Sequence, residues 1–204
     1  MITKIFSVKE SFELTKLIAR GEVVGFPTET VYGLAIIFDN EDSFKKLVSC
    51  KCREITKPIS LMVSKNYDLN KIAYVTDRAK KIINAFMPGA ITIILKAKEN
   101  LPSHVTMGRK TIGIRIPTND VALQILEDIK KPLLVTSANV SSCPSLMKYQ
   151  DVYETFNGKI AGLISEDAIN GVASTVVDIS DENNVTILRE GPITLEKIMK
   201  VLKE

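Results

Sequence analysis

Residues 22–34 read E-V-V-G-F-P-T-E-T-V-Y-G-L, and this stretch decides the class of fold. Residues 22–26 form a mainly apolar run, which predicts a buried strand. The run stops at Pro27, and two threonines, a carboxylate and a phenol follow within five residues. We therefore expect a strand that ends in a polar turn, which suits a small polar ligand held at the strand end. Taken one at a time, the same residues also fit an ordinary strand and turn with Tyr32 in the core.

Strands and helices are expected to alternate on both sides of this stretch. Ser7 and Glu10 have the spacing of a capping box for a helix over residues 7–20, which Gly21 ends. Further helices are expected at 41–50, 77–86, 119–128, 148–156 and 194–202, and strands at 59–63, 90–96, 112–116, 132–136, 174–179 and 185–189. This alternation predicts an α/β fold with a mainly parallel or mixed sheet. The sequence has no repeat, low-complexity tract or linker composition, so we expect residues 1–204 to form a single domain.

The composition excludes several classes of site. The chain has 204 residues, 45% apolar and 25% charged, which is typical of a globular protein with a sizeable core. A single histidine, His104, and three cysteines exclude zinc sites of several histidines or four cysteines, and mechanisms that need two imidazoles. No apolar run reaches the roughly 18 residues of a membrane span, and residues 1–6 are too short and mixed for a signal peptide. We expect a cytoplasmic protein.

The charge is unevenly distributed along the chain. Residues 1–102 hold 16 basic and 11 acidic side chains, a balance of +5, whereas residues 103–204 hold 11 and 13, a balance of −2. This asymmetry favours an anion site in the first half or at the junction of the halves.

A second segment with chemical potential is 51–58, which begins K-C-R. If it is extended, the i and i+2 spacing puts Lys51 and Arg53 on one side of the backbone, where they could clamp a polyphosphate. The same residues also fit a solvated charged loop, because K-x-R is a common pattern. Cys52 points the other way, and a catalytic thiolate is disfavoured because the only histidine is far away in the sequence.

A third segment, 135–142, reads V-T-S-A-N-V-S-S and follows a buried strand. Ser137 and Asn139 lie where open α/β sheets hold ligands, at the carboxyl end of a strand. A turn rich in Asn and Ser is the structural alternative. A serine nucleophile is disfavoured, because the flanks are not G-x-S-x-G and a triad would depend on His104 alone. Arg115 and Arg189 each lie at a predicted strand end.

Together and in this order, several stretches resemble the YrdC family, whose members are threonylcarbamoyl-AMP synthases. The combination of F-P-T-[DE]-T-x-Y-G-L, K-x-R and T-S-A-N is highly specific. The matching stretches span nearly the whole chain and lie at 26–34, 51–53, 88–92, 114–117, 136–139, 174–178 and 189–191. The resemblance implies a twisted open mixed sheet flanked by helices, with a basic concave face, in the short single-domain form of the family.

The resemblance also implies a reaction. ATP, L-threonine and bicarbonate would become L-threonylcarbamoyladenylate and pyrophosphate, an activity of the nucleotidyltransferase class. A separate tRNA threonylcarbamoyltransferase would then use the product to make N6-threonylcarbamoyladenosine in tRNA. Most of the catalysis would be positioning and neutralisation of charge.

The matched positions receive roles by resemblance. Lys51 and Arg53 would be catalytic and hold the phosphates and the carbamate region, and exchange of either to Ala is expected to abolish turnover with little effect on thermal unfolding. Residues implied to bind threonine and bicarbonate are Thr28, Tyr32 and Ser174, and those implied to bind the nucleotide, besides Lys51 and Arg53, are Arg115, Ser137, Asn139 and Arg189. No metal ligands are assigned, and Mg²⁺ is expected to accompany ATP through phosphates and water.

Three positions depart from the pattern of the family. Met62 occupies the place of the histidine in P-L-x-x-H and cannot donate its hydrogen bond. Ser142 stands where S-A-N-x-S-G has glycine, and Ala173 removes the carboxylate of G-[VI]-E-S-T. These differences concern ligand contacts more than the class of reaction.

Two other functions are considered. An RNA-binding or ribosome-assembly module of the same fold, with weak direct tRNA binding, draws support from the +5 balance of residues 1–102. It would usually carry a denser basic patch with exposed aromatic side chains. A carbamoyl-transfer domain like that of hydrogenase-maturation proteins is disfavoured, because the acylphosphatase and zinc-finger modules that accompany it are missing from the sequence.

Overall fold

One large sheet organises the molecule. A computed structural model describes residues 2–52, 58–181 and 183–203, and within these ranges ten strands form a single sheet in the order β1-β8-β2-β3-β7-β4-β6-β5-β9-β10. Parallel pairs such as β5–β9 and antiparallel pairs such as β3–β7 both occur, so the predicted α/β fold with an open mixed sheet is confirmed. The strands are β1 (Lys4–Phe6), β2 (Val24–Phe26), β3 (Gly33–Ile37), β4 (Ser60–Met62), β5 (Ile91–Lys96), β6 (Thr111–Arg115), β7 (Leu133–Ser137), β8 (Gly162–Ile164), β9 (Thr175–Asp178) and β10 (Thr186–Arg189).

The helices agree closely with the sequence pattern. They are α1 (Ser11–Ala19), α2 (Glu41–Cys50), α3 (Asp77–Phe86), α4 (Ser103–Thr106), α5 (Asp120–Ile129), α6 (Tyr149–Phe156) and α7 (Leu195–Lys203), with short 3-10 turns at Val8–Glu10 and Leu69–Lys71. The predicted capping box is present, since the Ser7 backbone N–H donates to Glu10 Oε2 at 2.9 Å. It caps the 3-10 turn that leads into α1, and Gly21 follows that helix with φ +79°.

Three strands were not expected from the pattern. The strand β3 directly follows the polar turn, and its pairing with β7 places it in the centre of the sheet. The strands β1 and β8 are three residues long and pair in parallel across more than 150 residues of sequence. Such short strands are formed by long-range pairing, because three residues carry too little periodicity to be recognised.

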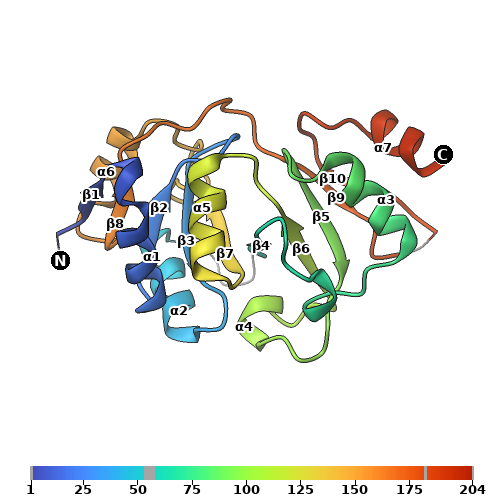
Figure 1. Ribbon diagram of the computed structural model, residues 1–204, viewed down its shortest axis with the longest axis horizontal. Helices are drawn as coiled ribbons and strands as arrows, with labels where there is room; N and C mark the ends of the chain where they lie inside the picture. The colour runs from blue at the N-terminus through green and yellow to red at the C-terminus, as the bar shows by residue number, and fades with distance from the viewer. Residues whose placement is uncertain (1, 53–57, 182, 204) are drawn as a thin grey trace.

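Helices cover the two faces of the sheet unequally. The larger core lies on one face, where α2, α3, α6 and α7 contribute Phe44, Leu47, Ala79, Ile82, Val152, Phe156 and Ile198. On the opposite face α1 and α5 pack over Ala35, Ile37, Met62 and Leu133. Figure 1 shows α1 and α5 on the viewer's side of the sheet, with β10 and the C-terminus at the far end from the N-terminus.

The face under α1 and α5 continues beyond these helices. Side chains two residues apart on a strand share a face, so Gly33, Val135 and Ser60 lie on the same face as Ala35, Leu133 and Met62. The register Met62↔Arg115 adds Arg115 to this face. The uncovered part of the sheet is therefore lined by small and polar side chains.

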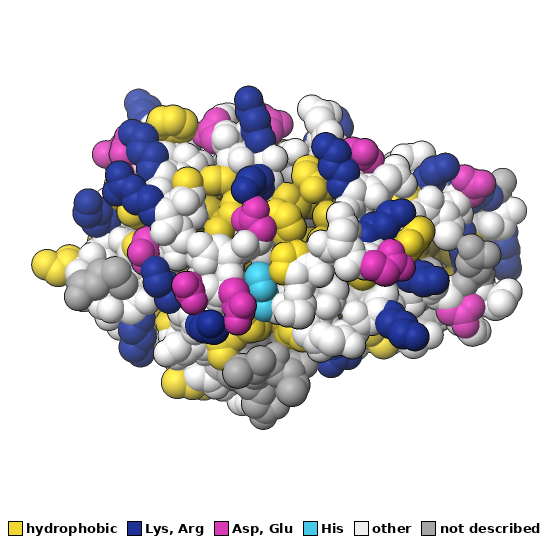
Figure 2. Space-filling model, turned by 90° about the horizontal axis from the view of Figure 1, so that it is seen from below, with side chains coloured by type: hydrophobic (Ala, Val, Ile, Leu, Met, Phe, Trp, Pro, Cys, Tyr) yellow, Lys and Arg dark blue, Asp and Glu magenta, His cyan; other side chains and the backbone are white. Residues whose placement is uncertain are grey.

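Figure 2 shows one face of the molecule, on which basic and acidic side chains are interspersed. The basic concave face and the single domain over residues 1–204 stay predictions. Among the described residues, no helix combines the length and apolar character that crossing a membrane requires.

Candidate active site

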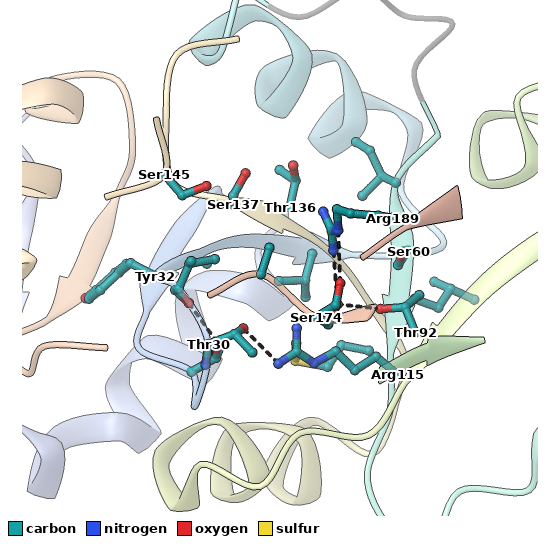
Figure 3. Close-up of a pocket in the computed structure, with 18 of the residues that line it drawn as sticks. Thr30, Tyr32, Ser60, Thr92, Arg115, Thr136, Ser137, Ser145, Ser174 and Arg189 are labelled. Atoms are coloured by element: carbon teal, nitrogen blue, oxygen red, sulfur yellow. Dashed lines mark hydrogen bonds between the residues drawn. The ribbon is translucent and has the colours of Figure 1, made fainter. Parts of the chain in front are cut away.

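A pocket of about 200 Å³ opens on the uncovered part of the sheet. It collects residues from the turn between β2 and β3, from strands β4 to β7, and from the segments around β9 and β10. The described residues that line it are Thr28, Thr30, Val31, Tyr32, Gly33, Pro58, Ile59, Ser60, Leu61, Met62, Thr92, Arg115, Val135, Thr136, Ser137, Ser145, Ala173, Ser174 and Arg189. Figure 3 shows Arg115 and Arg189 entering this space, with Ser174 between them.

The floor of the pocket depends on a small residue in β6. A Cβ atom added to Gly113 would lie 2.8 Å from Ser60 Oγ and 3.3 Å from Thr92 Cγ2. Both neighbours face the pocket, so glycine at this position leaves space that any larger side chain would fill.

Arg115 is anchored by the polar turn. Its Nη2 donates to Glu29 Oε1 at 2.6 Å and to Thr30 Oγ1 at 2.8 Å. The Thr30 and Thr28 hydroxyls are 2.9 Å apart, and the Thr28 hydroxyl donates to the carbonyl of Val31. Arg115 and Glu29 are both buried, and such a charge-assisted pair in a site of low dielectric fixes the guanidinium in place.

Arg189 is held by neutral groups. Its Nε donates to the Ser174 carbonyl at 2.9 Å and its Nη2 to Ser174 Oγ at 3.0 Å, and Ser174 Oγ also contacts Thr92 Oγ1 at 3.0 Å. Burial lowers the pKa of the Arg189 guanidinium, and the positive charge of Arg115 lowers it further. Two cations in one pocket with a single carboxylate between them favour an anionic ligand.

Tyr32 lines the pocket, but its hydroxyl does not point into it. The hydroxyl donates to the carbonyl of Ile164 at 2.5 Å, and the side chain is fully buried. Burial raises the pKa of this phenol, and the charges of Asp167 and Glu166 add to that effect. Figure 3 shows the ring directed away from Arg115 and Arg189, so Tyr32 shapes the wall rather than offering a hydroxyl to a ligand.

Lys51 lies beneath the T-S-A-N segment. It is 1% exposed, and its ammonium donates to the carbonyl oxygens of Ser137 and Asn139. Lys51 is the C-cap of α2 in helical conformation, so the condition that the segment is extended here is not met. Arg53 lies outside the described residues.

The structure brings six of the nine predicted site residues into one pocket: Thr28, Tyr32, Arg115, Ser137, Ser174 and Arg189. Asn139 supports the loop, accepting a hydrogen bond from the Ser137 hydroxyl and donating to the carbonyl of Cys143. Further polar residues in the pocket were not singled out as site residues from the sequence: Thr30, Ser60, Thr92, Thr136 and Ser145. Thr92 and Ser60 carried a recognisable signal, because each is a hydroxyl residue within an otherwise apolar strand.

The lining offers hydroxyls and guanidinium groups rather than metal ligands. Its described residues include neither Asp nor Glu, and no group of three or more His, Cys, Asp or Glu among the described residues could hold a metal ion. Carboxylate oxygens are the usual protein ligands of Mg²⁺, so this pocket is not built around a dedicated protein metal cage.

A family model whose description reads telomere recombination, Sua5/YciO/YrdC, matches residues 16–191. The chain belongs to the Sua5/YciO/YrdC family. The resemblance found in the motifs is thereby confirmed, and the pocket lies where those motifs meet.

Relatives in the family carry a consistent name. A protein of Pyrococcus abyssi named threonylcarbamoyl-AMP synthase is 34% identical over 100% of this chain, which spans 62% of that protein's length. A protein of Methanocaldococcus jannaschii named putative threonylcarbamoyl-AMP synthase is 35% identical over 98% of this chain and 97% of its own length.

A solved structure of the family has the same fold. The crystal structure of P. abyssi Sua5 complexed with L-threonine superposes with a TM-score of 0.90 at 31% identity, covering 98% of this chain and 60% of that one. The fold of this Sua5/YciO/YrdC member therefore extends to a relative whose crystal contains the amino acid.

The three departures from the family pattern have distinct surroundings. Met62 is buried against α1 and α5 and also lines the pocket. Ser142 adopts φ +71°, so the turn keeps the left-handed backbone that glycine would favour. Ala173 lines the pocket beside Ser174.

Proposed function

We propose that the chain is an L-threonylcarbamoyladenylate synthase that uses ATP, L-threonine and bicarbonate and releases pyrophosphate. It would act in the cytoplasm as a nucleotidyltransferase, and a separate transferase would use its product to modify tRNA. The names of the relatives support this proposal. The observation that carries it is the convergence of two guanidinium groups and several hydroxyls from distant motifs in one pocket.

The proposed chemistry needs no covalent intermediate. The threonine amine captures bicarbonate as a carbamate with loss of water, and a carbamate oxygen attacks the α-phosphorus of ATP. The bond from the α-phosphorus to its bridging oxygen breaks, and pyrophosphate leaves. The residues would act by holding these groups in line and neutralising charge.

Arg189 and Arg115 are suited to the anionic groups of the substrates. Arg189 donates to the carbonyl and hydroxyl of Ser174, so no carboxylate in these two contacts offsets its charge before a phosphate or carboxylate binds. Mg²⁺ would enter with ATP and be coordinated by phosphate oxygens and water, because the described lining has no carboxylate. The same hydroxyls that surround the arginines would orient threonine.

Lys51 would contribute from behind the site. Its ammonium fixes the loop that presents Ser137 to the pocket. Direct phosphate binding by Lys51 stays a prediction, as does that by Arg53, and for Lys51 it requires the ammonium to exchange these carbonyl oxygens for phosphate oxygens.

The test is pyrophosphate release by the purified protein. Release is expected only when ATP, L-threonine and bicarbonate are all present, and the adenylate should be detectable by mass spectrometry. Arg189→Gln should reduce turnover at least tenfold, while Lys131→Gln, which removes an exposed cation paired with Asp39, should leave it unchanged. Release without threonine, or no release at all, would refute the proposal, and tight salt-dependent RNA binding without affinity for ATP or threonine would favour an RNA-binding module.

A further inference from the structure

Glu29 is a buried carboxylate that the proposed chemistry does not use directly. It is 7% exposed and lies behind Arg115, outside the described lining of the pocket. Its Oε1 accepts from Arg115 Nη2 at 2.6 Å, whereas Glu29 Oε2 and Arg115 Nε are buried without a hydrogen-bond partner in the described part of the chain. A buried charge in this position needs a functional or structural reason.

The hydrogen bonds at Nη2 use both of its hydrogens. One goes to Glu29 Oε1 and the other to Thr30 Oγ1. The Thr28 hydroxyl donates its only hydrogen to the Val31 carbonyl, so in the contact between the two threonines Thr30 must be the donor. A directed chain therefore runs from Arg115 through Thr30 and Thr28 to the backbone, and it fixes the plane of the guanidinium.

Glu29 also sets the charge balance between the two arginines. The positive charge of Arg115 acts on Arg189 and disfavours its protonated form. A carboxylate 2.6 Å from Arg115 offsets part of that repulsion from the side away from the pocket. Arg115 can then face an anionic ligand without being displaced by Arg189.

We infer that Glu29 is a positioning residue: it acts through Arg115, by fixing the guanidinium plane and by offsetting its charge beside Arg189. Glu29 itself does not contact the substrates. The consequences for turnover rest on the proposed function, but the consequences for the Arg115 side chain do not.

The first experiment measures the Arg115 guanidinium by NMR in protein labelled with ¹⁵N-arginine and without any ligand. Arg115→Lys assigns the signals. In the unaltered protein the two Nη2 hydrogens of Arg115 should give separate, slowly exchanging signals. Glu29→Gln should average them, and so should Glu29→Asp, which keeps the charge but withdraws the carboxylate by one methylene group. Glu22→Gln, which breaks an ion pair with Lys46 elsewhere, should leave them separate.

The second experiment is a double-mutant cycle on pyrophosphate release. Glu29→Gln alone should lower kcat/KM at least tenfold, but in the Arg115→Gln background the same exchange should change it less than twofold. Unchanged Arg115 signals in both Glu29 variants would overturn the inference, and so would an undiminished effect of Glu29→Gln in the Arg115→Gln background. If the unaltered protein releases no pyrophosphate, the proposed function fails while the NMR result still decides the role of Glu29. If Glu29→Gln does not fold, Glu29→Asp serves in both experiments.

Discussion

The ammonium of Lys51 donates hydrogen bonds to the carbonyl oxygens of Ser137 and Asn139, which follow it by 86 and 88 residues. The end of α2 is thereby joined to the loop after β7. Ser141 reinforces this junction, because its backbone N–H donates to the carbonyl of Lys51 at 3.0 Å. A segment interpreted from the sequence as a phosphate clamp is therefore also part of the structural support of the pocket.

Lys51→Met tests that support. Loss of the ammonium leaves buried carbonyl oxygens without a donor, so the free energy of unfolding should fall by about 1–3 kcal/mol. This replaces the expectation from sequence that exchange of Lys51 leaves unfolding nearly unchanged. Lys45→Met in the same helix removes an exposed lysine and should change the free energy by less than about 0.5 kcal/mol. Urea denaturation of both variants distinguishes the outcomes, and equal effects would contradict the structural role.

Gly113→Ala should damage the floor of the pocket. The added methyl group would lie 2.8 Å from Ser60 Oγ, so we expect a loss of stability of about 1–3 kcal/mol and weaker threonine binding. Ser60→Ala removes the oxygen that the methyl group meets. The double variant should therefore recover stability relative to Gly113→Ala, as measured by thermal unfolding. Additive losses would show that the contact with Ser60 is not the cause.

Ser142→Gly should stabilise the protein. Ser142 has φ +71°, a conformation that costs a residue with a Cβ about 1–2 kcal/mol and costs glycine very little. We expect a gain near 1 kcal/mol in the free energy of unfolding. Ser49→Gly in α2 makes the same chemical change within a helix and should instead destabilise by about 0.5–1 kcal/mol. Destabilisation by Ser142→Gly would contradict the argument.

Cys50 should make stability depend on pH above 9. Burial raises the pKa of its thiol from 9.0 to about 11. The folded state therefore keeps the proton that the unfolded chain loses, so the stabilising contribution is complete below pH 9 and is lost as the pH rises toward 11. Between pH 8 and pH 10 the unaltered protein should lose about 1 kcal/mol more than Cys50→Ala, at about 1.4 kcal/mol for each pKa unit. Parallel curves for the two proteins in urea denaturation would contradict this assignment.

The fold was predictable where local patterns are strong. The helices at 41–50 and 77–86 match α2 and α3, because each has a polar N-cap and an apolar stripe. The central strand β3 was missed because the glycine and aromatic residues before it read as the end of a ligand-binding turn. The order of the strands depends on pairings such as β1 with β8, which no local pattern contains.

The candidate site divides in the same way. The chemistry of Arg115, Ser174 and Arg189 was apparent from residue type and motif, and these side chains meet in the pocket. The directions of the side chains were not predictable, since Tyr32 and Lys51 both carry groups suited to a ligand and both direct them at backbone carbonyls. The pairing of Glu29 with Arg115 joins residues 86 positions apart and depends on tertiary structure alone.

The order of strands in the sheet also governs when the pocket can exist during synthesis of the chain. The turn after β2 enters it from the first 35 residues, whereas Ser174 and Arg189 enter it from the last 35. A chain emerging from a ribosome therefore carries its polar turn, with Glu29 in place, long before the second arginine is available. The pocket is completed only near the end of translation, so a nascent chain can assemble most of its sheet before it can bind a ligand there.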